Sequence, residues 1–215
     1  TYLGAAWNRD IQQAQRSFIE LERRFDDGGT AKLSAIGVRR RNQGEFAWGN
    51  SFADRQTGDV AMIPYFSRDR TNEAIVDARL TRPWQWLGQR QEISVGASHQ
   101  RIKSSSAYNS STWGENGFIQ NIFAPNIDVP KPEVAIDEPS VSIQTQSALF
   151  GQLRIKPIAP LTVLAGARVA WYRSEQVGEP DETQRIDGRW VPYAGLIHEL
   201  NPTWSVYTSY SSIFS

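Results

Sequence analysis

The sequence contains no cysteine, which excludes disulfide frameworks, thiol catalysis and cysteine-based zinc sites. Its two histidines, His99 and His198, are far apart and neither belongs to a pair with metal-ligand spacing, so no metal site is expected. An excess of one charge is also lacking, because 23 basic residues balance 23 acidic ones. The longest run of like charge is Arg39–Arg41. A nucleic-acid partner is therefore not predicted.

No apolar run approaches the ~20 residues that a transmembrane helix requires. This absence does not exclude a membrane protein. A strand that crosses an outer membrane needs only ~10 residues, and only alternate residues face lipid. The chain begins with Thr1 instead of an initiator methionine, and we expect it to begin inside a longer protein.

Catalytic motifs are missing as well. The sequence has no Gly-x-Ser-x-Gly elbow, His-Glu-x-x-His helix, P-loop or dinucleotide-binding glycine pattern. Asp26 and Asp27 precede two glycines, so they fit a turn better than a pair of catalytic carboxylates. We therefore expect a protein that is not an enzyme and has no resident cofactor.

What is present is alternation of apolar and polar residues with a period of two, which predicts an all-β fold. The longest example is 161–171, where the odd-numbered residues are apolar and the even-numbered ones include Thr162, Gly166 and Arg168. We expect the odd-numbered side chains to face hydrocarbon and the others to face water. The predicted strands cover residues 17–25, 73–80, 92–98, 149–156, 161–171 and 204–210.

The predicted connections alternate between short and long. Short turns are expected at 26–29, 82–88, 157–160 and 201–202, and long loops at 42–59, 104–143 and 173–188. This alternation is typical of an antiparallel up-and-down outer-membrane β-barrel, with short turns at the periplasmic side and long loops outside the cell. A soluble β-sandwich or solenoid is the alternative, although sandwich strands average ~5 to 6 residues.

Tryptophan placement also favours the barrel. Trp84, Trp86, Trp171 and Trp204 lie at or near predicted strand ends, where a barrel carries its interfacial aromatic girdles. The alternative is that these rings cap the core of a soluble protein.

Several segments resemble the barrel of TonB-dependent ferric-siderophore receptors. Leu3–Asp10 followed by Phe18–Gly28 resembles the entry into a strand that ends in an EHRF-D-NG turn, and Pro83–Ser98 resembles the hairpin P-F-x-L-F-G-R-x-H-x-L-V-V-G-A-S. Pro160–Val169 is similar to the strand P-L-x-L-x-x-G-x-R.

The most specific similarity is in the last part of the chain. Val191–Leu200 followed by Trp204–Phe214 resembles T-P-Y-A-G-L-x-Y-D-L … W-S-x-Y-A-S-Y-x-x-I-F-x-P-Q, with His198 where the family often has tyrosine. The resemblance implies that residues 1–215 form about eight strands of a 22-stranded transmembrane β-barrel, with the plug domain and the C-terminal strands outside this sequence. It also implies a location in the outer membrane of a Gram-negative bacterium.

The implied function is a receptor that binds a ferric siderophore at its extracellular face and imports it with TonB-derived energy. Its expected partners are the ferric siderophore, the TonB complex acting through the plug, and outer-membrane lipid. The siderophore supplies the ligands of the ferric ion, so the protein needs no iron ligands of its own. A passive outer-membrane porin and a secreted carbohydrate-binding or adhesive β-domain remain as alternatives.

Siderophore-binding residues are expected on the upper strands and long loops, where aromatic rings stack on a chelating group. Packing within the loops is the alternative role for each of them. Arginines of the strands, such as Arg79, Arg154 and Arg168, are expected to pair with lumen acids such as Glu20, Glu22, Asp77 and Glu92. The candidate siderophore-binding residues are Trp48, Tyr65, Tyr108, Trp113 and Arg101.

Overall fold

The computed structural model describes residues 4–109 and 116–212, which form an antiparallel sheet with the order β1-β2-β3-β4-β6-β7-β8-β9. The short strand β5 pairs with β3 outside this path. Within the described residues, the predicted all-β, up-and-down fold is confirmed, and the sheet is open, with β1 and β9 at its edges. The strands are β1 Arg9–Arg24, β2 Thr30–Gly49, β3 Asp59–Trp86, β4 Gln89–Tyr108, β5 Phe118–Asn121, β6 Ser140–Ile158, β7 Leu161–Gln176, β8 Glu179–Glu199 and β9 Ser205–Ser211.

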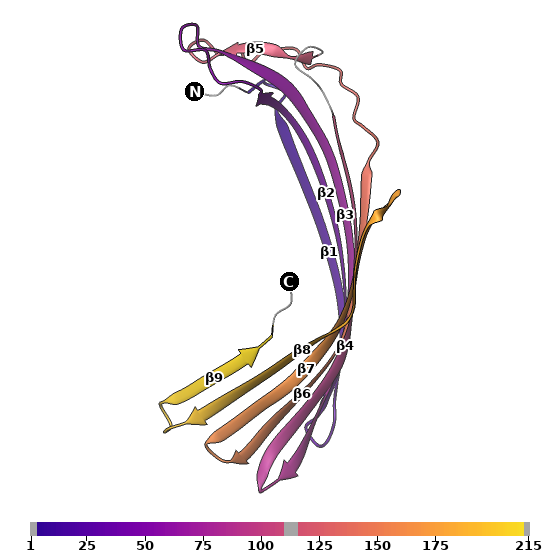
Figure 1. The fold of residues 1–215 in the computed structure, drawn as a ribbon, viewed down its shortest axis with the longest axis vertical. Helices are drawn as coiled ribbons and strands as arrows, with labels where there is room; N and C mark the ends of the chain where they lie inside the picture. Colours follow the sequence, from indigo (N-terminus) through magenta and orange to yellow (C-terminus); the bar gives the residue numbers. More distant parts are fainter. Residues whose placement is uncertain (1–3, 110–115, 213–215) are drawn as a thin grey trace. The chain divides into compact units, whose positions relative to one another are not determined.

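The chain divides into two compact units, and the four long strands β1 to β4 contribute to both. The first unit contains residues 1–15, 38–72 and 103–142, and the second contains 16–37, 73–102 and 143–215. In the second unit β7, β8 and β9 follow one another as neighbours in the sheet (Figure 1). The described part of the chain contains no helix that is long and apolar enough to cross a bilayer.

The tight turns of the second unit are built from residues that tolerate left-handed backbone. Leu87 and Gly88 have φ values of 53° and 69°, which is the two-residue turn whose twist matches that of a hairpin. After β1, the amide of Phe25 donates to Gly29 O at 2.9 Å, and the Asp27 carboxylate accepts from the Gly29 amide. These bonds close the first turn within the predicted range 26–29.

Two predicted connections are shorter than expected. The predicted loop 42–59 covers only residues 50–58, because β2 continues to Gly49. The predicted loop 173–188 is wrong, because β7 runs to Gln176 and β8 starts at Glu179 after the turn Val177–Gly178. These strand ends are polar on both sides, and register shifts at Ala170/Tyr172 and Ser174/Gln176 interrupt the period. The sequence there has no alternation to detect.

The predicted turn 82–88 is likewise narrower, because β3 continues through Trp86 and the turn is Leu87–Gly88. The predicted loop 104–143 is also too long, because β4 continues to Tyr108, β6 begins at Ser140 and β5 lies between them. β5 pairs antiparallel with the start of β3, from Asp59 opposite Asn121 to Met62 opposite Phe118 (Figure 1).

Side chains of the second unit separate onto a polar and an apolar face. The Tyr193 hydroxyl donates to Gln152 at 3.0 Å, and Tyr193 pairs across the sheet with Gly166. The even-numbered residues of β7 therefore share the polar face, and Leu161 and Trp171 point away from it. The sequence predicts an acid partner for Arg79. In the structure the Arg79 guanidinium carbon instead lies 5.2 Å from the centre of the Phe150 ring. In the same unit the predicted lumen acids Glu20 and Glu22 pair instead with Lys32 and Arg24, each at 2.8 Å.

Gln91 lies on β4, which pairs with β6, and its side chain is fully buried. The side chain forms hydrogen bonds with backbone groups of the neighbouring strands. Its amide nitrogen donates to the carbonyls of Trp86 and Lys156 at 2.9 and 3.0 Å. Its amide oxygen accepts from the Lys156 amide at 2.5 Å. One side chain thus satisfies backbone groups of two strands beside a turn.

Replacing Gln91 by leucine leaves those backbone groups without partners. We expect the free energy of unfolding to fall by about 2 to 3 kcal/mol. The measurement is the urea midpoint of the complete receptor in detergent, followed by tryptophan fluorescence. Gln85→Leu is the matched control, because Gln85 is exposed. Equal midpoints for the two variants would contradict the role assigned to Gln91.

Candidate functional site

One face of the first unit carries exposed aromatic rings. A Cβ at Gly44 would lie 2.7 Å from the Phe46 ring and 2.9 Å from Ser67 Oγ, so β2 and β3 present these residues on the same face. Side chains two positions apart on a strand share a face. Trp48, two residues after Phe46, and Tyr65, two before Ser67, therefore lie on this side as well. We call it the aromatic face.

Tyr108 joins the aromatic face from the neighbouring strand β4. The hydroxyls of Thr71 and Ser104 lie 3.5 Å apart across β3 and β4, so these two residues share a face. Alternation along both strands then places Tyr65 and Tyr108 on that same side. The exposed fractions are 64% for Trp48, 40% for Tyr65 and 53% for Tyr108, so all three rings are accessible.

Of the other two candidate residues, Arg101 does not join this face. Trp113 lies outside the residues that the structure describes. Arg101 belongs to the second unit, where it is exposed and follows Gln100, whose amide donates to Glu73 at 2.7 Å. The structure thus brings three of the five candidates onto one surface.

The opposite face of the first unit is centred on the buried carboxylate of Glu45, which is 8% exposed. It accepts hydrogen bonds from Lys131 at 2.8 Å, Arg9 at 3.0 Å and Gln43 at 3.1 Å. Burial raises the pKa of Glu45, but the hydrogen bonds from Lys131, Arg9 and Gln43 outweigh it and lower the pKa below its usual range. A carboxylate on β2 thus binds cations from β1 and from the loop after β5.

Phe66 forms the apolar part of the same arrangement and is 6% exposed. Lys131 Nζ lies 5.2 Å above its ring, and Trp7 meets it edge to face at 5.7 Å. The Asn109 side chain accepts from the Phe66 amide and donates to Pro64 O, which fixes the backbone of β3 at this point. Residues 131–136 therefore lie against β2 and β3 and enclose a polar hollow of about 690 Å³. We call residues 131–136 the strap.

No motif or periodicity marks Glu45, which lies in the predicted loop 42–59. Lys131 stands between Pro130 and Pro132, and flanking prolines favour an extended segment, which fits the strap. Its distant partner, however, depends on a contact across 86 positions. Periodicity describes one strand at a time and does not report such a contact.

Acidification is expected to release the strap. Because the folded pKa of Glu45 lies below its unfolded value, the interaction stabilises the fold fully above the unfolded value and is lost as the pH falls through the folded value. We expect amide hydrogen exchange of residues 131–136, corrected for its intrinsic pH dependence, to increase below about pH 4. The same increase in Glu45→Gln, which has no carboxylate there to titrate, would show that another group is responsible.

Metal chemistry finds no support in the described part of the chain, where no three His, Asp or Glu side chains are grouped as a metal ion would require. The aromatic face is a surface of exposed rings that carry hydrogen-bonding groups. It can bind a preformed complex by stacking and by shape.

Curated relatives of the chain are receptors for ferric siderophores. The chain is 24% identical over 237 residues to the ferric-pyoverdine M114 receptor PbuA of Pseudomonas sp. (strain M114), covering all of this chain and 28% of the relative. It is 27% identical over 219 residues to the ferripyoverdine receptor of Pseudomonas aeruginosa, covering 98% of this chain and 26% of the relative. The chain thus spans about a quarter of the length of these relatives.

Solved structures share the fold. The ferripyoverdine receptor of the outer membrane of Pseudomonas aeruginosa, bound to ferripyoverdine, matches with a TM-score of 0.83 at 23% identity, over 97% of this chain and 27% of that one. BauA, the ferric preacinetobactin receptor from Acinetobacter baumannii, matches with a TM-score of 0.75 at 15% identity, over 96% and 31%.

A family model agrees with both comparisons. The model described as "TonB dependent receptor-like, beta-barrel" matches residues 1–215, which is the whole of the sequence. The chain therefore belongs to the TonB-dependent receptor-like β-barrel family, as the sequence motifs predicted.

Proposed function

We propose that the protein binds a ferric siderophore of the pyoverdine class on the aromatic face and imports it with energy from the TonB complex. The observation that carries this proposal is the family match over residues 1–215, together with curated relatives that are ferric-pyoverdine receptors. The family and these relatives also place the chain in the bacterial outer membrane. In this proposal residues 1–215 are part of the barrel domain, and a separate plug domain contacts TonB.

The lengths of the strands support an extracellular role for the first unit. β3 has 28 residues, whereas crossing the apolar band of an outer membrane takes only ~10. Long stretches of β2, β3 and β4 therefore extend into water. The turns after β1 and β3 are tight, as the periplasmic turns of outer-membrane barrels are, so we assign these turns to the periplasmic side.

The chemistry of a ferric siderophore fits the aromatic face. The ferric ion arrives with its ligands already in place, so the receptor has to recognise the outside of the complex. Exposed indole and phenol rings present flat surfaces for chelating groups, and their polar atoms accept or donate hydrogen bonds at the rim. Trp48, Tyr65 and Tyr108 supply such surfaces from three neighbouring strands.

The rival functions have less support. A passive porin and a secreted carbohydrate-binding or adhesive domain would each share exposed aromatic side chains. The match over residues 1–215 is to a family of receptors, and the curated relatives carry siderophore names. Transport, not catalysis, is the activity that the family supports.

Truncating the rings tests the proposal. In the complete receptor, Trp48→Ala and Tyr65→Ala are each expected to weaken ferripyoverdine binding about tenfold, which corresponds to ~1.4 kcal/mol per lost stacking contact. The measurement is equilibrium binding of the ferric complex to the purified receptor, followed by quenching of fluorescence. Trp204→Ala is the matched control, because Trp204 is 68% exposed but belongs to the second unit.

Two results would overturn the proposal. Binding that is unchanged in Trp48→Ala, Tyr65→Ala and the double variant would remove the aromatic face from recognition. Iron-limited growth that no siderophore of a broad panel restores through the intact receptor would remove the transport function itself.

A further inference from the structure

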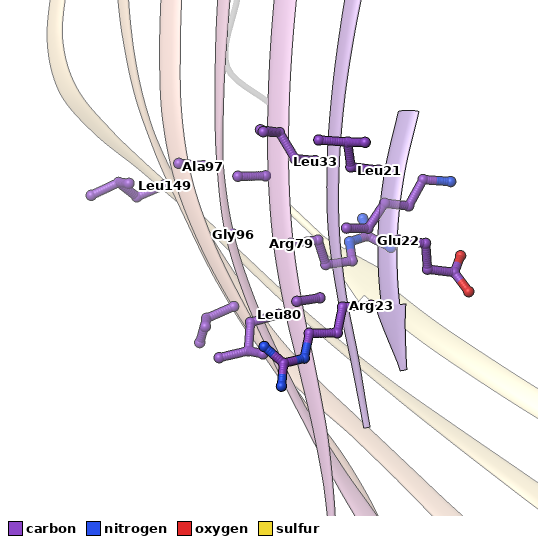
Figure 2. Close-up of a pocket in the computed structure, with 13 residues that line it drawn as sticks. Leu21, Glu22, Arg23, Leu33, Arg79, Leu80, Gly96, Ala97 and Leu149 are labelled. Carbon is purple, nitrogen blue, oxygen red and sulfur yellow. The ribbon is translucent and has the colours of Figure 1, made fainter. Parts of the chain in front are cut away.

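An apolar hollow of about 660 Å³ lies on the second unit, and Glu22, Lys32 and Arg79 are among the residues that line it. Each of these three is one position away from a leucine of the hollow on its strand, so alternation directs its side chain to the opposite face. Five neighbouring strands contribute to it, and Figure 2 shows residues that line it, with Leu21, Leu33, Leu80 and Leu149 labelled among them. The large side chains are well exposed, with Leu21 at 62% and Leu149 at 54%. The apolar residues around the hollow are Leu21, Ala31, Leu33, Ala78, Leu80, Val95, Ala97 and Leu149.

A cation stands at the edge of this apolar surface. Arg23 lines the hollow and shares its face with Leu21, two residues earlier on β1. Its guanidinium carbon lies 5.3 Å from the centre of the Phe25 ring. Arg82 stacks on the same ring at 4.5 Å, and its charge is paired with Asp27 at 3.0 Å. Within the described residues, Arg23 contacts the Phe25 ring, and no carboxylate forms an ion pair with Arg23.

The position of Arg23 requires an explanation if this face contacts lipid. An arginine on the lipid face costs ~2–4 kcal/mol at the bilayer midplane and much less near the interface. Arg23 precedes the turn after β1 by only a few residues, so its long side chain reaches the level of the lipid head groups. There a guanidinium finds phosphate oxygens, with which it forms bidentate charge-assisted hydrogen bonds.

We propose that the hollow and Arg23 together bind one anionic phospholipid of the periplasmic leaflet. An acyl chain occupies the apolar hollow, and the head-group phosphate pairs with the Arg23 guanidinium. Phe25 holds that guanidinium from its other side through a cation–π contact. Arg82 adds positive potential near the phosphate, although Asp27 neutralises much of it. This inference rests on the proposed outer-membrane function, because it requires the apolar face to contact lipid.

The occupant is a lipid because the cation borders an apolar surface. A free phosphate ion would gain the Arg23 pairing but would leave the leucines exposed. A neutral detergent tail would cover the leucines but would leave the cation unpaired. A diacyl lipid with an anionic head group satisfies both parts of the surface at once.

Native mass spectrometry of the complete receptor tests the site. The receptor is exchanged from neutral detergent into mixed micelles with equal phosphatidylglycerol and phosphatidylcholine. We expect the unmodified receptor to retain phosphatidylglycerol at least fivefold over phosphatidylcholine, and Arg23→Gln to bring that ratio near one. Arg23→Lys keeps the charge but loses the bidentate geometry, so its ratio should fall between them. Arg55→Gln, in the loop 50–58, is the matched control and should keep the full preference.

Three outcomes would overturn the inference. The first is equal retention of the two lipids by the unmodified receptor, and the second is an unchanged preference in Arg23→Gln. The third is loss of bound phosphatidylglycerol on adding millimolar inorganic phosphate, which would identify a simple anion site. Ferripyoverdine binding is measured on the same samples, so a failure of lipid selectivity with intact siderophore binding is distinguishable from failure of the proposed function.

Discussion

Valine in place of Gly96 is expected to destabilise the sheet by about 3 kcal/mol or more, because β4 has no room for a side chain at this position. A Cβ there would lie 2.5 Å from the carbonyl oxygen of Ala78 and would collide with the Phe150 ring. The ring can turn aside, but the carbonyl belongs to the backbone of β3 and is fixed in the sheet. The free energy of unfolding of the complete receptor in detergent, from urea titration, measures the effect.

Gly151→Ala is the matched control for this prediction. Gly151 lies on β6, and a Cβ built there meets no atom within 4 Å. It should change the free energy of unfolding by less than about 1 kcal/mol, the usual difference between glycine and alanine in a strand. If the variants at Gly96 and Gly151 proved equally stable, close approach of the strands would not be the reason for glycine at position 96.

Leucine in place of Glu45 is expected to loosen the strap of residues 131–136. Removing the carboxylate leaves Arg9 and Lys131 without their common partner. Breaking a fully buried ion pair costs ~3–5 kcal/mol. Here the side chains of Arg9 and Lys131 are 51% and 42% exposed, so water replaces part of the interaction. We therefore expect the free energy of local opening to fall by about 2 kcal/mol, which accelerates hydrogen exchange of the strap about thirtyfold.

Hydrogen exchange of the complete receptor, resolved at residues 131–136, is the measurement for the strap. Glu133→Leu is the control, because it alters an exposed acid of the strap itself. It should change exchange by less than about twofold, as expected of an exposed charge. A rate in Glu45→Leu that matches this control would mean that the contact of Lys131 with the Phe66 ring holds the strap without the carboxylate.

The strands of the second unit could be predicted because one of their faces is apolar. Alternation in 73–80, 92–98 and 161–171 fell on β3, β4 and β7, and the glycines of the turns marked where those strands end. The period of two becomes visible only where hydrocarbon or a core selects every other residue. The strand ends around 173–188 are polar on both sides, so periodicity predicts a loop where the structure has strands.

The candidate site could be predicted only in part, for a related reason. Exposed aromatic residues such as Trp48 and Tyr108 stand out in a polar segment, and the strand register then places them on one face. Glu45 and Lys131 have no such mark, because each is an ordinary charged residue until the fold buries the carboxylate. Glu45 and Lys131 are 86 positions apart in the sequence, and only the folded chain brings them into contact.

The pairing of β5 with β3 sets an order in which the sheet can be completed. Apart from β4 and β6, which β5 separates in the sequence, the other pairings join consecutive strands, so each of those hairpins can close soon after its second strand is available. β5 instead returns across β4 to the start of β3, and its docking requires both of those strands to be in place. Docking of β5 is therefore a late step of assembly, and intermediates that lack it should still expose the edge of β3 at its first residues.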